Sequence, residues 1–194
     1  MSRSRRLLFE ACFFLSGAAG LVYQVVWGRR LAAFFGSTLE GVSVVLAVFM
    51  AGLGAGAFVL GRRADRTADA GRLYGVLEIL VGLYGAVSLP VLSLAGSGFQ
   101  AVSVPLPPGP ALVLLKIGVS LVALFLPCFL RGGTRPALVR AFSGSGESPA
   151  RPLGLLYALN LAGAVAGTLA AGFFLIESAG LLRTTLGAAA ANLL

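Results

Sequence analysis

Long apolar blocks of membrane-spanning length constrain the fold of this sequence more than any other feature. Five of them run over approximately 7–27, 40–60, 73–95, 110–130 and 153–176. A helix needs about 20 apolar residues to cross the hydrocarbon core of a bilayer. With 58% hydrophobic and only 11% charged residues, the chain could not cover its apolar surface as a soluble domain. The sequence therefore predicts an all-α integral membrane protein whose main partner is the lipid bilayer.

A sixth apolar segment begins after Arg183 and is still apolar at Leu194. A helix over 183–194 would extend about 18 Å at about 1.5 Å per residue, against a hydrocarbon core of about 30 Å. We therefore expect a single transmembrane domain over 1–194, a six-helix bundle whose sixth helix is incomplete, and we interpret the sequence as a fragment.

The arginines predict the orientation of this bundle. Eleven of them precede the first block or lie between blocks two and three or four and five, namely Arg3, Arg5, Arg6, Arg62, Arg63, Arg66, Arg72, Arg131, Arg135, Arg140 and Arg151. The other side has Arg29, Arg30 and Arg183, and the expected loop over 97–109 is uncharged. Because positive residues concentrate on the cytoplasmic side, we expect a multi-pass protein of a bacterial inner membrane with a cytoplasmic N-terminus.

The same composition argues against several other classes of function. The formal charge of +8 comes from arginines that lie between apolar blocks, so it indicates topology and not a nucleic-acid partner. The chain has no histidine, and Cys12 and Cys128 are far apart within apolar blocks. We therefore expect no metal site, no structural disulfide and no catalytic site in this chain.

The second and fifth blocks resemble each other. A shift of 111 residues superimposes an A-x(3)-A-G-x(2)-A-G pattern of the second block on the fifth, with Gly52 and Gly56 matching Gly163 and Gly167. A true repeat would contain three helices, and an odd number inverts the second copy, as in each half of a major facilitator transporter. The alternative is a chance match between two helices rich in glycine and alanine.

These four glycines are predicted to pack helices against each other. Glycines four residues apart let helix backbones approach closely within a membrane. The run 52–56 (GLGAG) also resembles a nucleotide-binding loop, but it lies mid-block, without the strand and helix that such a loop requires.

The stretch 61–66 (GRRADR) resembles the conserved loop between helices 2 and 3 of the major facilitator superfamily, G-x-x-x-D-R-x-G-R-R/K. The following Gly71-Arg72 arrives three residues later than that pattern asks. The resemblance implies a gating role for Gly61, Asp65 and Arg66, in which aspartate and arginine stabilise one gating state. The alternative is an ordinary positive loop with a local Asp–Arg pair.

The flanking sequence is similar to the membrane portion of bacterial fused major-facilitator/spermidine-synthase proteins over nearly the whole chain. Its specific positions include Tyr23-Gln24, Trp27 and the run 157–160 (YALN). The resemblance implies a C-terminal synthase domain that transfers an aminopropyl group from decarboxylated S-adenosylmethionine to putrescine. This chain has no strand–glycine-loop–helix unit or acidic diamine pocket for that chemistry, so we expect no cofactor in it.

The resemblance implies a membrane anchor or a small-amine transport module beside the enzyme. Two other hypotheses are a stand-alone transporter half that works as a homodimer with a second six-helix half, and a structural membrane subunit.

Polar residues inside the blocks are the candidates for substrate binding, because ionisable groups within a membrane are costly and usually functional. They are Glu78, Glu10, Gln24 and Asn160. The two carboxylates would suit a cationic polyamine. The alternative is that they pair with nearby arginines or extend to the membrane interface.

Overall fold

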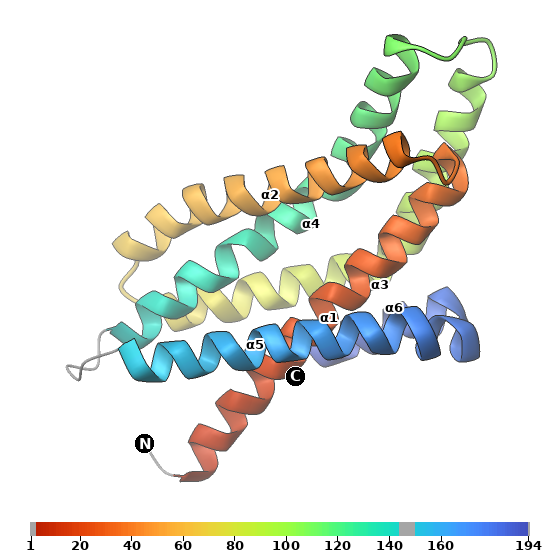
Figure 1. Ribbon diagram of the computed structural model, residues 1–194. Coiled ribbons are helices and arrows are strands. Elements are labelled where there is room, and N and C mark those ends of the chain that lie inside the picture. The colour runs from red at the N-terminus through yellow and green to blue at the C-terminus, as the bar shows by residue number, and fades with distance from the viewer. Residues whose placement is uncertain (1–2, 144–149, 194) are drawn as a thin grey trace.

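The chain forms a bundle of long helices, without strands in the part that the structure describes (Figure 1). The computed structural model describes residues 3–143 and 150–193. Its elements are α1 (Arg3–Phe35), α2 (Leu39–Arg66), α3 (Ala70–Ser103), α4 (Pro110–Ser143), α5 (Ala150–Ala170), the π-helical turn η1 (Ala171–Leu175) and α6 (Ile176–Asn192). Five helical segments in these ranges are long and apolar enough to cross a membrane, which identifies a multi-pass membrane protein.

The first four helices extend beyond the apolar blocks. The first continues through Arg29 and Arg30 to Phe35, and it ends where Gly36 adopts a positive φ of 80°. Glycine takes this conformation without the steric cost of a Cβ, so it commonly ends helices. Thr38 then caps α2 by accepting a hydrogen bond from the Gly41 amide at 3.2 Å. The expected loop over 97–109 shortens to 104–109, because α3 continues to Ser103.

The largest departure concerns α4, which does not end near 130 but continues to Ser143. Arg131, Arg135 and Arg140 therefore lie in a helix and not in a loop. The apolar residues 137–139 continue the helix beyond the first two arginines, and an isolated charge does not interrupt backbone hydrogen bonding. The arginines of this stretch thus have defined directions with respect to the bundle.

No loop separates the last two predicted helices, and the helical run over 154–192 is 39 residues long. It contains a break at Gly180, whose φ of 76° and ψ of 169° are not helical. Beyond this glycine the chain turns back at the blue end of Figure 1, and α6 packs against α1 and α3. The turn lies close to the expected boundary at 183, and the chain after it is one short helical segment.

Two helix pairs make the most extensive contacts in the bundle, α2 with α4 and α1 with α5. Glycines lie at both crossings. A Cβ on Gly56 would overlap the Phe129 carbonyl oxygen of α4, and one on Gly163 would overlap the Phe14 carbonyl oxygen of α1. A Cβ on Gly167 would overlap the Ala18 carbonyl oxygen, and one on Gly52 would lie 2.6 Å from the Cys128 Cβ, so both are also at close contacts.

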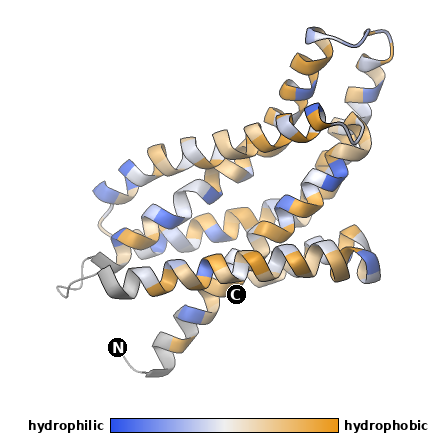
Figure 2. Cartoon of the chain, viewed as in Figure 1, coloured by the Kyte–Doolittle hydropathy of each residue, from blue (hydrophilic) through white to orange (hydrophobic). Residues whose placement is uncertain are grey.

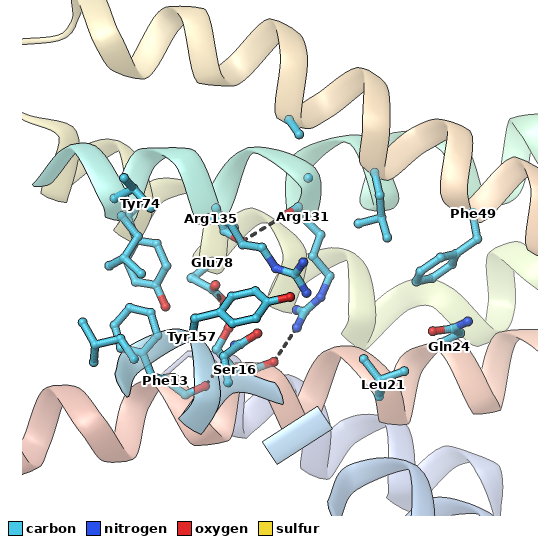
Figure 3. A pocket seen from close by; sticks show the side chains of 18 of the residues that line it. Phe13, Ser16, Leu21, Gln24, Phe49, Tyr74, Glu78, Arg131, Arg135 and Tyr157 are labelled. Carbon is cyan, nitrogen blue, oxygen red and sulfur yellow. Dashed lines mark hydrogen bonds between the residues drawn. The ribbon is translucent and has the colours of Figure 1, made fainter. Parts of the chain in front are cut away.

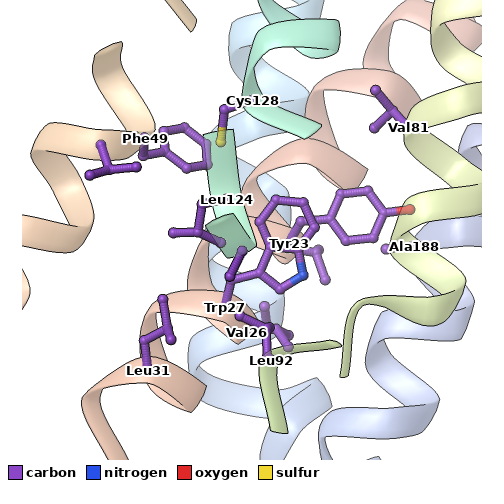
Figure 4. Packing of buried hydrophobic residues seen from close by; sticks show 14 of the residues in the cluster. Tyr23, Val26, Trp27, Leu31, Phe49, Val81, Leu92, Leu124, Cys128 and Ala188 are labelled. Carbon is purple, nitrogen blue, oxygen red and sulfur yellow. The ribbon is translucent and has the colours of Figure 1, made fainter. Parts of the chain in front are cut away.

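An apolar core holds the helices together at the centre of the bundle (Figure 4). Tyr23 and Trp27 of α1 stack with ring centroids 5.1 Å apart, and Trp27 meets Tyr84 of α3 edge-on at 5.8 Å. Many large apolar side chains elsewhere are exposed on the outside of the bundle. In Figure 2 hydrophobic residues cover most of the helical surface, which a bilayer would solvate.

Candidate functional site

A cavity of about 390 Å³ lies between the two glycine-packed helix pairs (Figure 3). Side chains of α1, α2, α4 and α5 form its walls, and Tyr74 and Glu78 of α3 also line it. Most of the lining is apolar, including Phe13, Phe49 and Leu53. A concave apolar site with a few polar groups is the usual form of a small-molecule binding site.

Glu78 is buried beside this cavity, and both of its carboxyl oxygens have partners. Ser16 of α1 donates its hydroxyl hydrogen to Oε1 at 2.8 Å. Asn192 of α6 donates from Nδ2 to Oε2 at 2.7 Å and to the Glu78 backbone oxygen at 3.1 Å. The acidic group predicted to bind substrate therefore joins three helices that are distant in sequence.

Arg131 of α4 directs its guanidinium group into the bundle toward α1. Its Nη2 donates to the Ser16 carbonyl oxygen, so Ser16 bridges Arg131 and Glu78. A Cβ on Gly20 would overlap the guanidinium group, so this glycine makes room for it. The other terminal nitrogen, Nη1, is buried and has no hydrogen-bond partner among the described residues.

Arg135 lies one helical turn further along α4 and is exposed. Its guanidinium group lies over the Tyr157 ring of α5, 5.8 Å from the centroid, and both residues line the cavity. Among the described residues that line the cavity, the charged ones are Glu78, Arg131 and Arg135. Even with Glu78 ionised, the lining carries a net positive charge.

The other residues predicted to bind substrate have different positions. Gln24 and Asn160 line the cavity, and Asn160 also donates from Nδ2 to the Phe13 carbonyl oxygen at 3.1 Å. Glu10 is half-buried in α1 and has a partner of its own, and it does not belong to the lining. The cavity thus unites Glu78, Gln24 and Asn160 and leaves Glu10 apart.

Arg131 and Arg135 are cavity residues that the sequence interpretation missed, because it placed them in a loop between helices. The signal that would have found them is the apolar run 137–139, which indicates that the helix continues past both arginines.

The predicted gating residues lie in the last turns of α2. Gly61 is buried against Pro136 of α4, whose Cβ would be 3.3 Å from an added Cβ. Asp65 and Arg66 are exposed, and within the described ranges no side-chain hydrogen bond or ion pair involves either of them. The residue that caps a helix here is Asp69, which accepts from the Arg72 amide at 2.9 Å.

An ion pair lies toward the opposite end of the bundle. Lys116 of α4 is buried, and its Nζ is 2.7 Å from Oε1 of Glu40, in the first turn of α2. The pair joins the start of α2 to α4, where these two helices pack together.

Comparison with protein-family models, with curated proteins and with solved structures finds no match to this chain. Within residues 3–143 and 150–193, no cluster of three or more histidine, cysteine or acidic side chains is placed to hold a metal ion. The assignment of function therefore depends on the geometry of the cavity.

Proposed function

We propose that this chain is a transport module of the major-facilitator type, one six-helix half built from two inverted three-helix repeats, with the cavity as its substrate site. The observation that carries the proposal is the cavity itself, which holds a buried acid and two arginines between two helix pairs. Ionisable groups within membrane spans usually face a substrate or ion pathway. Binding sites between structural repeats are common in secondary transporters.

The glycine contacts support the repeat. A shift of 111 residues relates Gly56 to Gly167, and it also relates their contact residues, since Phe129 corresponds to Ala18. Likewise, Gly52 and Gly163 match, and a Cβ on Gly52 would lie 3.2 Å from the Phe125 oxygen, the counterpart of Phe14. The contact of α2 with α4 thus corresponds to the contact of α5 with α1, which supports a repeat over a chance match of two helices.

The wider setting of the module remains part of the proposal. The arginine distribution supports a cytoplasmic N-terminus in a bacterial inner membrane. The resemblance stated above supports a place beside an aminopropyltransferase domain, with decarboxylated S-adenosylmethionine as that domain's co-substrate. A second six-helix half, supplied by another copy or by further chain, would close the cavity for transport. A pure membrane anchor is the competing function.

Accessibility of the cavity from both sides of the membrane tests this proposal. Cys12 and Cys128 are replaced by alanine, and Gln24→Cys places one thiol in the cavity. A membrane-impermeant maleimide is then applied to right-side-out and inside-out vesicles. We expect labelling in both orientations, because alternating access exposes a central site to each side in turn.

Val122→Cys in the same background is the control. Val122 lies on the exposed outer surface of α4 and not in the cavity lining, so lipid should protect it in both vesicle types. Labelling of Gln24→Cys from one side only, or from neither, would contradict transport and leave the anchor function.

A further inference from the structure

The geometry points to an anionic ligand: we infer that the cavity binds a small molecule or lipid that carries an anionic group on an apolar body, with Arg131 and Arg135 as the contact residues. This inference rests on the proposed function in treating the cavity as a substrate site, and it replaces the small amine as the class of substrate.

The hydrogen bonding of Arg131 supplies the first argument. A guanidinium group has five N–H donors, and the buried Nη1 of Arg131 has no acceptor in the described structure. A buried donor without a partner is costly, and more so when it is charged. An anionic oxygen in the cavity would balance the charge of Arg131, and it would provide the missing acceptor once the guanidinium group rotates to expose Nη1.

Glu78 cannot take that role in the described conformation. Its Oε1 and Oε2 are engaged by Ser16 and Asn192, and no ion pair joins it to Arg131 within the described residues. Each carboxyl oxygen keeps a second lone pair, so these hydrogen bonds do not exclude an ammonium group. The positive charges of Arg131 and Arg135 disfavour one by repulsion. The hydrogen bonds of Glu78 connect the helices around the site, whereas Arg131 has an N–H donor without an acceptor.

Arg135 adds a second positive group at an exposed position of the cavity wall. Its stacking on Tyr157 holds the guanidinium group beside the cavity while leaving it accessible. Arg135 and Arg131 lie one turn apart on α4, so positive charge extends along the cavity wall from the exposed Arg135 to the buried Nη1 of Arg131. Two neighbouring positive charges attract anions and repel polyamines.

The apolar walls define the rest of the ligand. Phe13, Phe49, Met50 and Leu53 line the same cavity and offer no hydrogen bonds from their side chains. They would bury a hydrocarbon or aromatic body whose acidic group faces Arg131. A soluble aromatic carboxylate and the head region of an anionic phospholipid share this chemistry.

Equilibrium binding to the purified chain in nanodiscs tests the inference. Benzoate is the soluble anionic probe and spermidine is the cationic one, each measured by calorimetry in discs of phosphatidylcholine. We expect saturable binding of benzoate and none of spermidine. A parallel titration in discs containing phosphatidylglycerol identifies the source of the anion: unchanged benzoate affinity indicates a soluble ligand, and weakened affinity indicates that the lipid occupies the site.

Two variants assign the contacts. Arg131→Gln should weaken benzoate binding roughly tenfold or more, because it removes a charge-assisted hydrogen bond. Arg135→Gln should weaken it by a few-fold, and since Arg135 is exposed, that variant should fold even if Arg131→Gln does not. Arg62→Gln is the matched control: Arg62 is also exposed and stacked on an aromatic ring, Phe58 at 3.9 Å, but it lies outside the cavity lining.

Loss of benzoate affinity in Arg135→Gln with normal affinity in Arg62→Gln supports the inference. The inference is overturned if folded protein binds no benzoate, if Arg135→Gln and Arg62→Gln bind benzoate equally well, or if spermidine binds instead. Because these are equilibrium measurements in one state, they are independent of whether Gln24→Cys is labelled from both sides. A membrane anchor that binds anions would bind benzoate without labelling of Gln24→Cys from both sides. A transporter for another substrate would show that labelling without benzoate binding.

Discussion

At the scale of single residues, the main feature is how Ser16 serves two charged groups at once. Its hydroxyl group donates to Glu78, and its carbonyl oxygen accepts from Arg131. The amide of Asn192 completes the cluster from α6. Networks in a low-dielectric interior stabilise a structure when their members are satisfied and destabilise it when one member is lost. Glu78 therefore links α1, α3 and α6 through hydrogen bonds that do not require a ligand.

Replacement of Glu78 separates its shape from its charge. Glu78→Ala removes the acceptor of the Ser16 hydroxyl and one of the two acceptors of the Asn192 amide, which keeps the backbone oxygen of residue 78. We therefore expect a loss of about 1–3 kcal/mol in the free energy of unfolding. Glu78→Gln keeps a side-chain oxygen as an acceptor and should cost less than about 1 kcal/mol. Denaturation in mixed detergent micelles measures both.

The control for this prediction is Glu177→Ala, which removes an exposed glutamate from the first turn of α6. It should leave stability nearly unchanged. If Glu78→Ala is no more destabilising than Glu177→Ala, the network has no structural importance. Polyamine uptake by vesicles that is normal in the parent chain and lost in Glu78→Gln would favour the amine hypothesis over an anionic substrate.

At the scale of helices, close approach of backbones replaces the hydrophobic effect as the means of packing. Lipid chains are as apolar as leucine side chains, so helices associate through tight contacts between small residues. Glycines at the α2–α4 and α1–α5 crossings provide such contacts. Gly85 belongs to the same class, since an added Cβ would overlap the Tyr23 ring. Tight glycine contacts thus extend beyond the repeated pattern.

Alanine substitution tests these contacts with a single added carbon. Gly56→Ala would push its Cβ into the Phe129 carbonyl oxygen, so α2 and α4 must separate, at a cost of about 1–3 kcal/mol. Gly54→Ala, two residues earlier in the same helix, meets open space and should be neutral or slightly stabilising, because alanine favours helix. Thermal unfolding of both variants provides the comparison, and equal melting temperatures would contradict the packing role.

At the scale of the whole molecule, the helices define two ends of the bundle. The α2–α3 connection and the start of α5 lie at the left of Figure 1, and the α1–α2 and α3–α4 connections lie at the right. The guanidinium group of Arg131 points into the bundle, so we omit this residue from the arginines that indicate orientation. Ten arginines still remain on the side of the N-terminus against three on the other.

Cysteine labelling tests this topology. Ala68→Cys lies in the α2–α3 connection and Val104→Cys in the α3–α4 connection, and both positions are exposed. In the background without Cys12 and Cys128, an impermeant maleimide should label Val104→Cys only from outside the cell and Ala68→Cys only from the cytoplasmic side. Labelling of both positions from the same side would contradict the proposed orientation.

The sequence by itself determined the class of fold and the approximate positions of the helices, and its glycine pattern indicated where helices approach closely. These are local properties: bilayer thickness sets the length of an apolar block, and glycine spacing sets a smooth helix face. Helix ends were predicted less well, because charged residues such as Arg29 and Arg135 are compatible with a helix that continues past the apolar block. Only α4's full length brings Arg131 and Arg135 into the cavity wall.

Only the tertiary structure decided which polar groups meet. Ser16 is 62 residues from Glu78, and Asn192 is 114 residues from it. No periodicity in the sequence relates these positions, because their contact depends on where three helices cross and on the reversal of the chain at Gly180. The same crossings turn Arg131 inward, and so an arginine that indicated topology in the sequence becomes a charged donor in the cavity wall.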